Sequence, residues 1–217
     1  MIKLVVFDLD GTLVNAYPAV SASVNHTLKV LGFPARSDVE IKRSVGEGDR
    51  QLMKKFVGEK LADKAIVIYR PHHAKALELK GNVRFLPGVL GALKFLKNKG
   101  YKLAIASNRP TRFTHIILKV LGIDPLFDVV LCADRAKKPK PYPDMLLTIA
   151  KRLKIDRADV LYVGDMTIDV KCAHAAGIRM AAVCTGSCSK KELKSLKPWA
   201  FMGTMVSLKP LITKEIK

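Results

Sequence analysis

Short runs of apolar residues alternate along the chain with longer segments in which apolar residues return every three or four positions. The short runs are residues 4–7, 102–106, 128–131, 160–163 and 180–183. Uninterrupted apolar runs are typical of parallel strands that are buried on both faces. The longer segments have helical periodicity and cover residues 88–99, 110–121, 143–154 and 168–176. This alternation predicts an α/β fold with a doubly wound, mostly parallel sheet.

Residues 15–80 interrupt the alternation directly after the first predicted strand. The segment has no strand-like alternation and shows three helical patterns, at 19–31, 38–57 and 60–79. We therefore expect an α/β core domain formed by residues 1–14 and 81–217, and a small all-helical cap domain formed by residues 15–80. Ligands bind at the carboxyl ends of the strands in such sheets, so an insertion at this position is placed to act as a lid.

The 217 residues carry a formal net charge of +19, so the surface attracts anions such as phosphate esters, nucleic acids and anionic lipids. Aromatic residues make up only 6% of the chain and no nucleic-acid-binding module is recognisable, so no specific nucleic acid is expected as a partner. No apolar run approaches the roughly 18 residues that a membrane span needs. The four cysteines lack a CxxC pair and indicate reduced thiols. We expect a cytoplasmic monomer or homodimer.

Four aspartates follow predicted strands. Asp8 and Asp10 come after the first strand, and Gly11 then permits a sharp turn. Asp165 and Asp169 follow a later strand and lie four residues apart. Each aspartate alone could be a loop residue or a helix cap, but the carboxyl ends of parallel strands meet at one edge of a sheet. Together the four carboxylates look like oxygen ligands for Mg²⁺.

Two further polar sites follow strands. Ser107 and Asn108 precede Pro110, which is a plausible first residue of a helix, and side chains at a helix start can form an anion cradle with the backbone N–H groups. Lys140 lies in a basic loop with three prolines, whose stiffness suits an ammonium group held in one place. Taken alone, the serine and asparagine are a common helix cap, and the basic loop is a solvated surface.

Four segments resemble, in order and spacing, the four motifs of the haloacid dehalogenase superfamily. They are residues 8–14 (DLDGTLV), 107–109 (SNR), 140–143 (KPYP) and 164–169 (GDMTID). The helical insertion after the first motif is similar to that of the phosphoglycolate-phosphatase-like branch, which carries a helical cap. The resemblance covers almost the whole chain and implies a phosphoric monoester hydrolase with a Rossmann-like core.

The resemblance implies a role for each matching residue. Asp8 would attack phosphorus and form a phosphoaspartate, while Asp10 would protonate the leaving oxygen and later activate water. Asp8, Asp165 and Asp169 would hold Mg²⁺ together with the backbone carbonyl of Asp10. The transferring phosphoryl group would be bound by three side chains, those of Ser107, Asn108 and Lys140. Because dehalogenases and phosphonate-cleaving relatives carry another residue at the acid position, Asp10 favours phosphate transfer.

The predicted cap contains a glycine-containing loop at residues 44–50, where related enzymes place a substrate-specificity loop. We expect Gly46, Glu47 and Arg50 to contact the substrate. Arg50 or Lys42 could bind a substrate carboxylate, or both could be ordinary solvent-exposed charges. The histidines of the segment show no metal-ligand spacing and are expected to be structural or solvated, namely His26, His72 and His73.

We predict a Mg²⁺-dependent phosphatase that hydrolyses a small phosphate monoester similar to phosphoglycolate. An inorganic pyrophosphatase or a sugar-phosphate mutase of the same superfamily is the alternative. The mutases carry a Thr-x-x-x-His-x-x-Ala-Trp pattern in the first cap helix, which residues 24–28 do not match. A nucleic-acid-binding protein without enzymatic activity is a further alternative that the positive charge allows.

Overall fold

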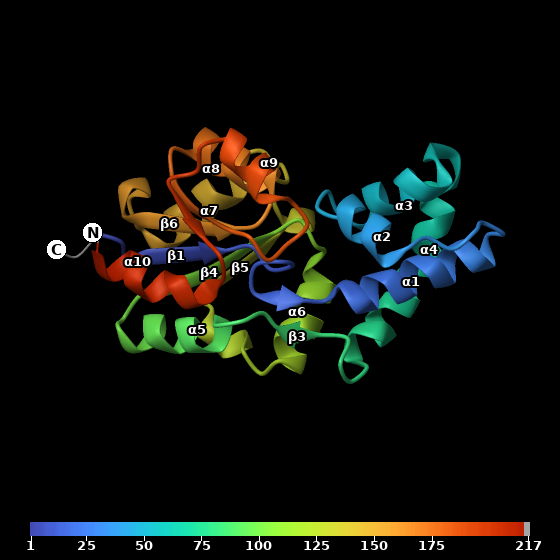
Figure 1. The fold of residues 1–217 in the computed structure, drawn as a ribbon, viewed down its shortest axis with the longest axis horizontal. Helices are drawn as coiled ribbons and strands as arrows, with labels where there is room; N and C mark the ends of the chain where they lie inside the picture. The colour runs from blue at the N-terminus through green and yellow to red at the C-terminus, as the bar shows by residue number, and fades with distance from the viewer. Residues whose placement is uncertain (215–217) are drawn as a thin grey trace.

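The core of the protein is a sheet of six parallel strands, seen in a computed structural model that describes residues 1–214. The strands lie in the order β5-β4-β1-β6-β7-β8 (Figure 1). Their bounds are β1 (Leu4–Phe7), β4 (Lys102–Ser107), β5 (Val129–Cys132), β6 (Val160–Gly164), β7 (Arg179–Val183) and β8 (Ala200–Met202). The first strand lies in the middle of the sheet, so its carboxyl end is flanked by the ends of β4 and β6.

Helices cover both faces of the sheet, because alternate residues of a strand point to opposite sides. In β1, Val5 and Phe7 pack into one hydrophobic core, whereas Leu4 and Val6 pack into another. The helices of the first core are α5 (Val89–Asn98), α6 (Thr111–Val120) and α10 (Leu208–Lys214). Those of the second core are α7 (Asp144–Leu153), α8 (Thr167–Ala176) and α9 (Lys190–Ser195). The predicted doubly wound sheet is confirmed.

Each strand predicted for the core is present, with bounds that differ by one residue at most. The apolar pattern does not predict the edge strand β8, which has only three residues and only one fully buried side chain, that of Met202. Such a short segment at the edge of a sheet carries too little apolar pattern to stand out from a loop. The pattern therefore predicts the longer strands, including the other edge strand β5, but not this short one.

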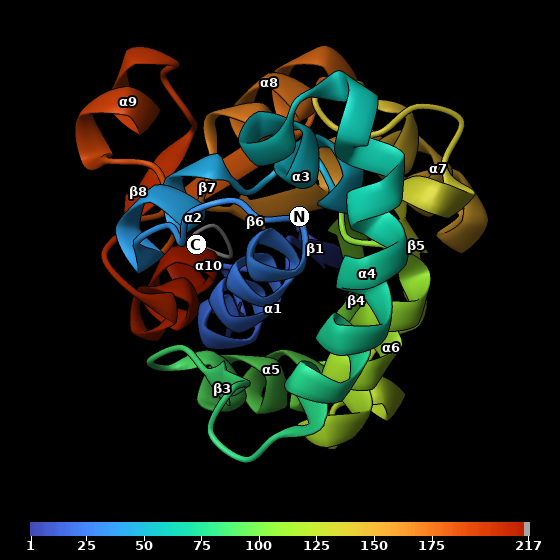
Figure 2. The ribbon, with the colours of Figure 1, turned by 90° about the vertical axis from the view of Figure 1, so that its right-hand side faces the viewer.

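Four helices form a separate bundle at the carboxyl ends of the strands, and we call this bundle the cap (Figure 1 and Figure 2). They are α1 (Tyr17–Val30), α2 (Asp38–Ser44), α3 (Asp49–Val57) and α4 (Glu59–Glu78). The cap has its own buried core, which includes Leu28 and Met53. The helical pattern at 38–57 is two helices, because Gly46 and Gly48 take φ angles of 122° and 91° in the loop between them. Among the described residues, no helix has the length and apolar character needed to cross a membrane.

The chain passes between the core and the cap through a short ribbon. In this ribbon β2 (Val14–Asn15) pairs antiparallel with β3 (Arg84–Phe85), so the outgoing and returning segments lie side by side. Next to the ribbon, Ala19 of α1 and Leu77 of α4 pack into the core of the sheet rather than into that of the cap. The sequence pattern does not predict these two-residue strands. The domain boundaries at residues 14 and 81 stay a prediction.

Candidate active site

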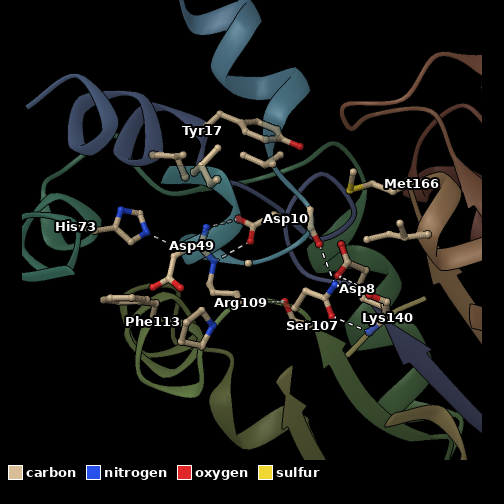
Figure 3. A pocket seen from close by; sticks show the side chains of 18 of the residues that line it. Asp8, Asp10, Tyr17, Asp49, His73, Ser107, Arg109, Phe113, Lys140 and Met166 are labelled. Atoms are coloured by element: carbon tan, nitrogen blue, oxygen red, sulfur yellow. Dashed lines mark hydrogen bonds and ion pairs between the residues drawn. The ribbon is translucent and has the colours of Figure 1, made fainter. Parts of the chain in front are cut away.

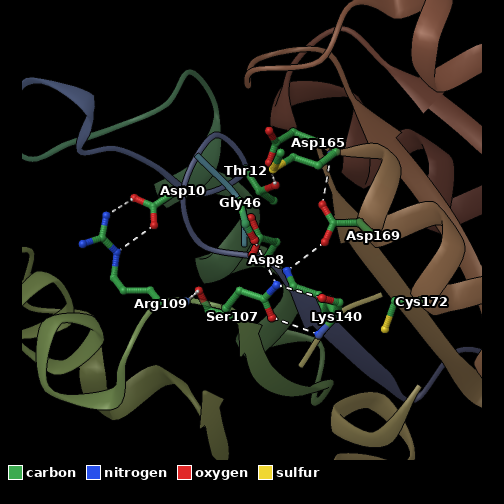
Figure 4. Close-up of polar contacts among 12 residues, drawn as sticks. Asp8, Asp10, Thr12, Gly46, Ser107, Arg109, Lys140, Asp165, Asp169 and Cys172 are labelled. Carbon is green, nitrogen blue, oxygen red and sulfur yellow. Dashed lines mark hydrogen bonds and ion pairs between the residues drawn. The ribbon is translucent and has the colours of Figure 1, made fainter. Parts of the chain in front are cut away.

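The carboxyl ends of three neighbouring strands bring most of the predicted site residues together (Figure 4). Asp8 directly follows β1, Ser107 is the last residue of β4, and Asp165 directly follows β6. The last residue of β1 pairs in register with both neighbouring strands close to their ends. Residues that are far apart in the sequence therefore meet at one edge of the sheet, as expected for parallel strands.

Three buried carboxylates form the centre of the site. Asp8, Asp165 and Asp169 each offer an oxygen atom, and these atoms lie within 4.8 Å of one another. Burial raises the pKa of Asp8 to about 7, against the opposing charge of Lys140 and with support from the charge of Asp169. Burial, followed by the charge of Asp8, also holds the pKa of Asp165 well above its usual range. Like charges this close repel, so a set of hard oxygen donors of this kind fits a divalent cation.

Asp165 is held by the turn after β1 and by the loop before α9. Thr12 Oγ1 donates a hydrogen bond to Asp165 Oδ1 at 2.9 Å, and the backbone N–H of Ser187 donates to Oδ2 at 3.3 Å. Gly11 has a φ angle of 84°, and a Cβ at this position would lie 2.6 Å from Asp165 Oδ2. The glycine of the first motif is therefore required both by the backbone conformation and by the close approach of the two segments.

Lys140 places a buried ammonium group against the same carboxylates. Its Nζ donates to Asp8 Oδ1 at 2.6 Å and to Asp169 Oδ1 at 2.7 Å, and it lies 3.0 Å from the Tyr162 hydroxyl. Burial alone would lower the pKa of Lys140, but the charges of Asp169 and Asp8 outweigh burial and hold this pKa above its ordinary range. The side chain therefore stays protonated and adds a fixed positive charge beside Asp8.

Asn108 joins three segments of the chain. Its Oδ1 accepts a hydrogen bond from the backbone N–H of Lys140 at 2.9 Å, and its Nδ2 donates to the Lys140 carbonyl at 3.0 Å. The same Nδ2 donates to the carbonyl of Gly46 in the cap at 2.9 Å. The amide of Asn108 is thus committed to the Lys140 loop and to the cap. Ser107 Oγ accepts from the backbone N–H of Arg109 at 3.2 Å, and its own hydroxyl proton can still reach a phosphate oxygen.

The side chain of Asp10 lies apart from the acidic cluster and pairs with Arg109 (Figure 4). Nε and Nη2 of Arg109 donate to the two carboxyl oxygens at 2.7 and 2.8 Å, which makes a bidentate pair. The remaining nitrogen, Nη1, lies 2.6 Å from Nε2 of His73 in helix α4. The structure thus brings three of the four predicted aspartate carboxylates together, and it places the fourth at the boundary between core and cap.

A pocket between the cap and the core reaches Asp8 and Asp10 (Figure 3). Away from the carboxylates, apolar and aromatic side chains from both parts line it, among them Tyr17, Val20, Leu52, Tyr69, Phe113 and Met166. The sequence pattern does not single out Arg109, His73 or Tyr17, which also line this pocket. Arg109 follows Asn108 in the second motif, so its place in the sequence could have indicated that it lies at the site. His73 and Tyr17 are brought to the pocket only by the packing of the cap helices.

One of the three cap residues expected to contact the substrate lines this pocket, namely Gly46. Glu47 forms an ion pair with Lys55 at 2.7 Å, and Arg50 pairs with two carboxylates of helix α4 at 2.7 and 2.8 Å. These charges are satisfied within the cap on exposed side chains. Neither Glu47 nor Arg50 lines the pocket, and the same holds for Lys42.

The fold and the site together define a class of protein. A doubly wound core, a helical insertion after the first strand and a buried cluster of aspartates with a lysine define a hydrolase built for phosphoryl transfer. In a comparison with protein-family models, residues 5–183 match the model described as haloacid dehalogenase-like hydrolase. The chain belongs to this family.

Several proteins similar to this chain are phosphoglycolate phosphatases. Phosphoglycolate phosphatase 1 of Pseudomonas aeruginosa is 33% identical over 193 residues, which cover 85% of this chain and 70% of the relative. A phosphoglycolate phosphatase of Haemophilus influenzae is 32% identical over 92% of this chain and 93% of its own. The crystal structure of a predicted phosphoglycolate phosphatase from Haemophilus somnus matches with a TM-score of 0.88 at 28% identity, over 97% of this chain and 98% of the other. This chain is a phosphatase that acts on a small phosphorylated substrate.

Proposed function

We propose that this phosphatase hydrolyses a small phosphate monoester of the phosphoglycolate type through a phosphoaspartate on Asp8, with Mg²⁺ as its metal ion. The observation that carries the proposal is the position of Asp8, which lies buried beside two further carboxylates and the charged Lys140. The names of the similar proteins support the phosphoglycolate type of ester. The four free thiols support a cytoplasmic location.

Asp8 is the proposed nucleophile. One of its carboxylate oxygens forms a bond to phosphorus while the bond from phosphorus to the ester oxygen breaks, and the electron pair goes to that oxygen. The hydrogen bond of 2.6 Å from Lys140 Nζ holds the attacking carboxylate in one orientation. The positive charge of Lys140 also weakens the repulsion between this carboxylate and the phosphate dianion.

Asp10 is the proposed general acid and general base. It gives a proton to the ester oxygen as the bond to phosphorus breaks, and it then takes a proton from the water that attacks the phosphoaspartate. This second attack breaks the bond between Asp8 and phosphorus, which yields inorganic phosphate and a free carboxylate. The position of Asp10 in the same pocket as Asp8 supports this role.

The phosphoryl group is bound by groups at the strand ends. The hydroxyl of Ser107 lines the pocket with Asp8, and its hydrogen bond strengthens as negative charge builds on the phosphoryl oxygens. The ammonium group of Lys140 directs its protons at Asp8, Asp169 and Tyr162, so it acts on the phosphoryl group through its positive charge. Asn108 holds the loop that carries Lys140 and so contributes to the position of the ammonium group. A divalent cation held by the three clustered carboxylates would supply further neutralisation of the phosphate charge.

The variant Asp8→Asn tests the nucleophile. Asparagine has nearly the same size, but its amide is a poor nucleophile, so phosphate release should fall by at least about a thousandfold. The fold should persist, because the substitution removes one of several repelling charges from a buried cluster. Asp156→Asn is the matched control, because Asp156 is exposed and only caps a short helix, a role that asparagine shares. Wild-type turnover in Asp8→Asn would show that another group attacks phosphorus.

A panel of esters tests the substrate. We expect phosphoglycolate to give a higher kcat/KM than pyrophosphate, a hexose phosphate or a nucleoside monophosphate. The readout is inorganic phosphate released in the presence of Mg²⁺. A preference for pyrophosphate would identify the inorganic pyrophosphatase. Conversion of a sugar phosphate to its isomer without phosphate release would identify the mutase.

A further inference from the structure

Arg109 is a buried cation at the boundary between the core and the cap. Its side chain is only 9% exposed, and all three of its guanidinium nitrogens have partners. Two nitrogens donate to Asp10 and the third reaches His73 (Figure 3). Lys140, the other cation that lines this pocket, is committed to Asp8 and to Asp169. Arg109 is therefore the pocket cation that lies beside the proposed acid rather than beside the nucleophile.

His73 holds the guanidinium group from the cap. An arginine only donates hydrogen bonds, so His73 Nε2, which lies 2.6 Å from Arg109 Nη1, must accept. The proton of the neutral imidazole then lies on Nδ1, which has the hydroxyl of Ser23 at 3.2 Å and the carbonyl of Ala19 at 3.4 Å as acceptors. The imidazole is fully buried and stacks on the ring of Tyr69. The cap thus holds Arg109 in one orientation.

The bidentate pair is at odds with the role proposed for Asp10. Both of its carboxyl oxygens accept hydrogen bonds from Arg109, and a carboxylate held in this ion pair has no proton to give to an ester oxygen. An anionic group on the substrate would compete for the same N–H groups, because a carboxylate matches the planar fork of an arginine as well as Asp10 does. Arrival of such a group would separate Asp10 from Arg109 without leaving the buried guanidinium unpaired.

The walls of the pocket around Arg109 favour this exchange. They are formed by apolar and aromatic side chains, including those of Leu52, Tyr69 and Phe113. Such surroundings exclude water and strengthen an ion pair with the guanidinium group. Asp49, the acidic residue on this wall, forms its ion pair with Arg70 at 2.7 Å, and its charge also contributes to the raised pKa of Arg109.

We propose that Arg109 determines substrate specificity by binding a carboxylate on the leaving group of the phosphate ester. On binding, this carboxylate replaces that of Asp10 on the guanidinium group, and Asp10 becomes free to take up a proton from water and to turn it toward the ester oxygen. The proposal rests on the proposed function and narrows its substrate class to phosphate monoesters that carry a carboxylate close to the ester oxygen. The bond changes at phosphorus are those of the phosphoaspartate route.

Two esters with the same two-carbon skeleton test the proposal. Phosphoglycolate carries a carboxylate, and ethyl phosphate carries a methyl group in its place. For each enzyme the readout is the ratio of kcat/KM for phosphoglycolate to kcat/KM for ethyl phosphate. Both values scale with the amount of folded enzyme, so the ratio does not change when a variant is merely less stable.

Three variants distinguish the effect of the charge of Arg109 from the effect of its shape. Arg109→Met removes the charge and keeps a long side chain, whereas Arg109→Lys keeps the charge but loses the planar fork. Arg112→Met is the control, because Arg112 is an exposed arginine in the first turn of the following helix, α6, and does not line the pocket. The ratio should fall at least about 100-fold in Arg109→Met, mainly through a higher KM for phosphoglycolate. It should fall less in Arg109→Lys and stay at the native value in Arg112→Met.

The outcomes that contradict the proposal are distinct. An equal loss on both esters in Arg109→Met would overturn it, because Arg109 would then act only by positioning Asp10. A native enzyme that prefers ethyl phosphate to phosphoglycolate would also overturn it, while the phosphatase assignment would stand. A native enzyme that releases phosphate from neither ester would contradict the proposed function, and this proposal with it.

Discussion

The charged side chains of this site are buried in ion pairs, and each of the two cations has a second partner. Asp8 and Asp169 share the ammonium group of Lys140, and Asp10 shares the guanidinium group of Arg109 with the neutral His73. A buried charge costs several kcal/mol when its partner is removed. Substitution of a cation in this site should therefore affect stability as well as activity, which is why a ratio of two substrates is a better readout than a single rate.

His73 predicts a pH dependence of stability. Burial lowers its pKa to about 2, and the charge of Arg109 acts in the same direction. The unfolded chain binds a proton near the ordinary pKa of about 6.5, so between these two values only the unfolded state is protonated. Stability from the neutral histidine is complete above the unfolded pKa and falls as the pH drops. From about pH 7.5 to about pH 5.5 the loss should be about 1.4 kcal/mol in the free energy of unfolding.

Denaturant unfolding of two variants checks whether His73 causes this pH dependence of stability. His73→Gln keeps an acceptor for Arg109 but does not titrate, so its free energy of unfolding should fall less between the two pH values than that of the native protein. His115→Gln is the control, because His115 lies exposed on α6 and pairs with Asp124 on the surface. A native-like acid loss in His73→Gln would assign the pH dependence to other groups.

The loop between α2 and α3 contacts the site through the backbone of Gly46. The Gly46 carbonyl accepts from Asn108, and a Cβ on Gly46 would lie 2.4 Å from Met166 Cε. The φ angle of 122° also disfavours any other residue at this position. The loop therefore needs glycine for its backbone, and a Cβ at this position would also force the end of the flexible Met166 side chain to move.

Gly46→Ala should weaken catalysis by straining this loop and displacing the Met166 side chain, which lines the pocket. We expect kcat/KM for phosphoglycolate to fall about tenfold, because a small displacement of a group that closes a site has large effects on rate. Gly58→Ala is the matched control, since Gly58 also has a positive φ angle, 80°, but faces open space. Both variants should lose about 1 kcal/mol of stability from backbone strain. Similar activity in the two variants would mean that the loop contact does not matter for turnover.

Across the whole molecule, the cap is attached to the core in two different ways. Near the ribbon of β2 and β3, apolar side chains of α1 and α4 are part of the core of the sheet. On the side of α2, the contacts are polar, such as the ion pair of 3.2 Å between Arg43 and Glu192. Exposed pairs of this kind contribute about 0–1 kcal/mol. The α2 side of the cap is therefore the more weakly attached one.

The acidic cluster links distant parts of the chain, so a bound metal ion should stabilise the whole fold. We expect Mg²⁺ at about a hundred times its dissociation constant to add about 2.7 kcal/mol to the free energy of unfolding. This shift should be lost in Asp165→Asn and kept in Asp38→Asn, which alters an exposed aspartate of the cap. Excess EDTA should abolish activity, and Mg²⁺ should restore it. Activity that persists in EDTA would exclude the metal from the mechanism.

The part of the fold that can be predicted from the sequence is the part in which several consecutive residues are buried. The central strand β1 is buried on both faces, so each of its residues is apolar and the run is visible in the sequence. The ribbon of β2 and β3 has two residues in each strand, which is too short for any period. The helical period at 38–57 does not report the break between α2 and α3, whereas the glycine-containing loop expected at residues 44–50 lies at this break.

The sequence by itself determined the order of the elements, the family and the residues that end the central strands. These features depend on local periodicity and on the spacing of motifs, which can be read from residues close together in the sequence. Only the tertiary structure decided how side chains from distant segments pair. In the folded protein Asp10 pairs with Arg109, and His73 contacts the same arginine. Arg50 lies on the surface of the cap. Such choices depend on which helices pack together, since a hydrogen bond acts over about 3 Å while the partners lie tens of residues apart in the sequence.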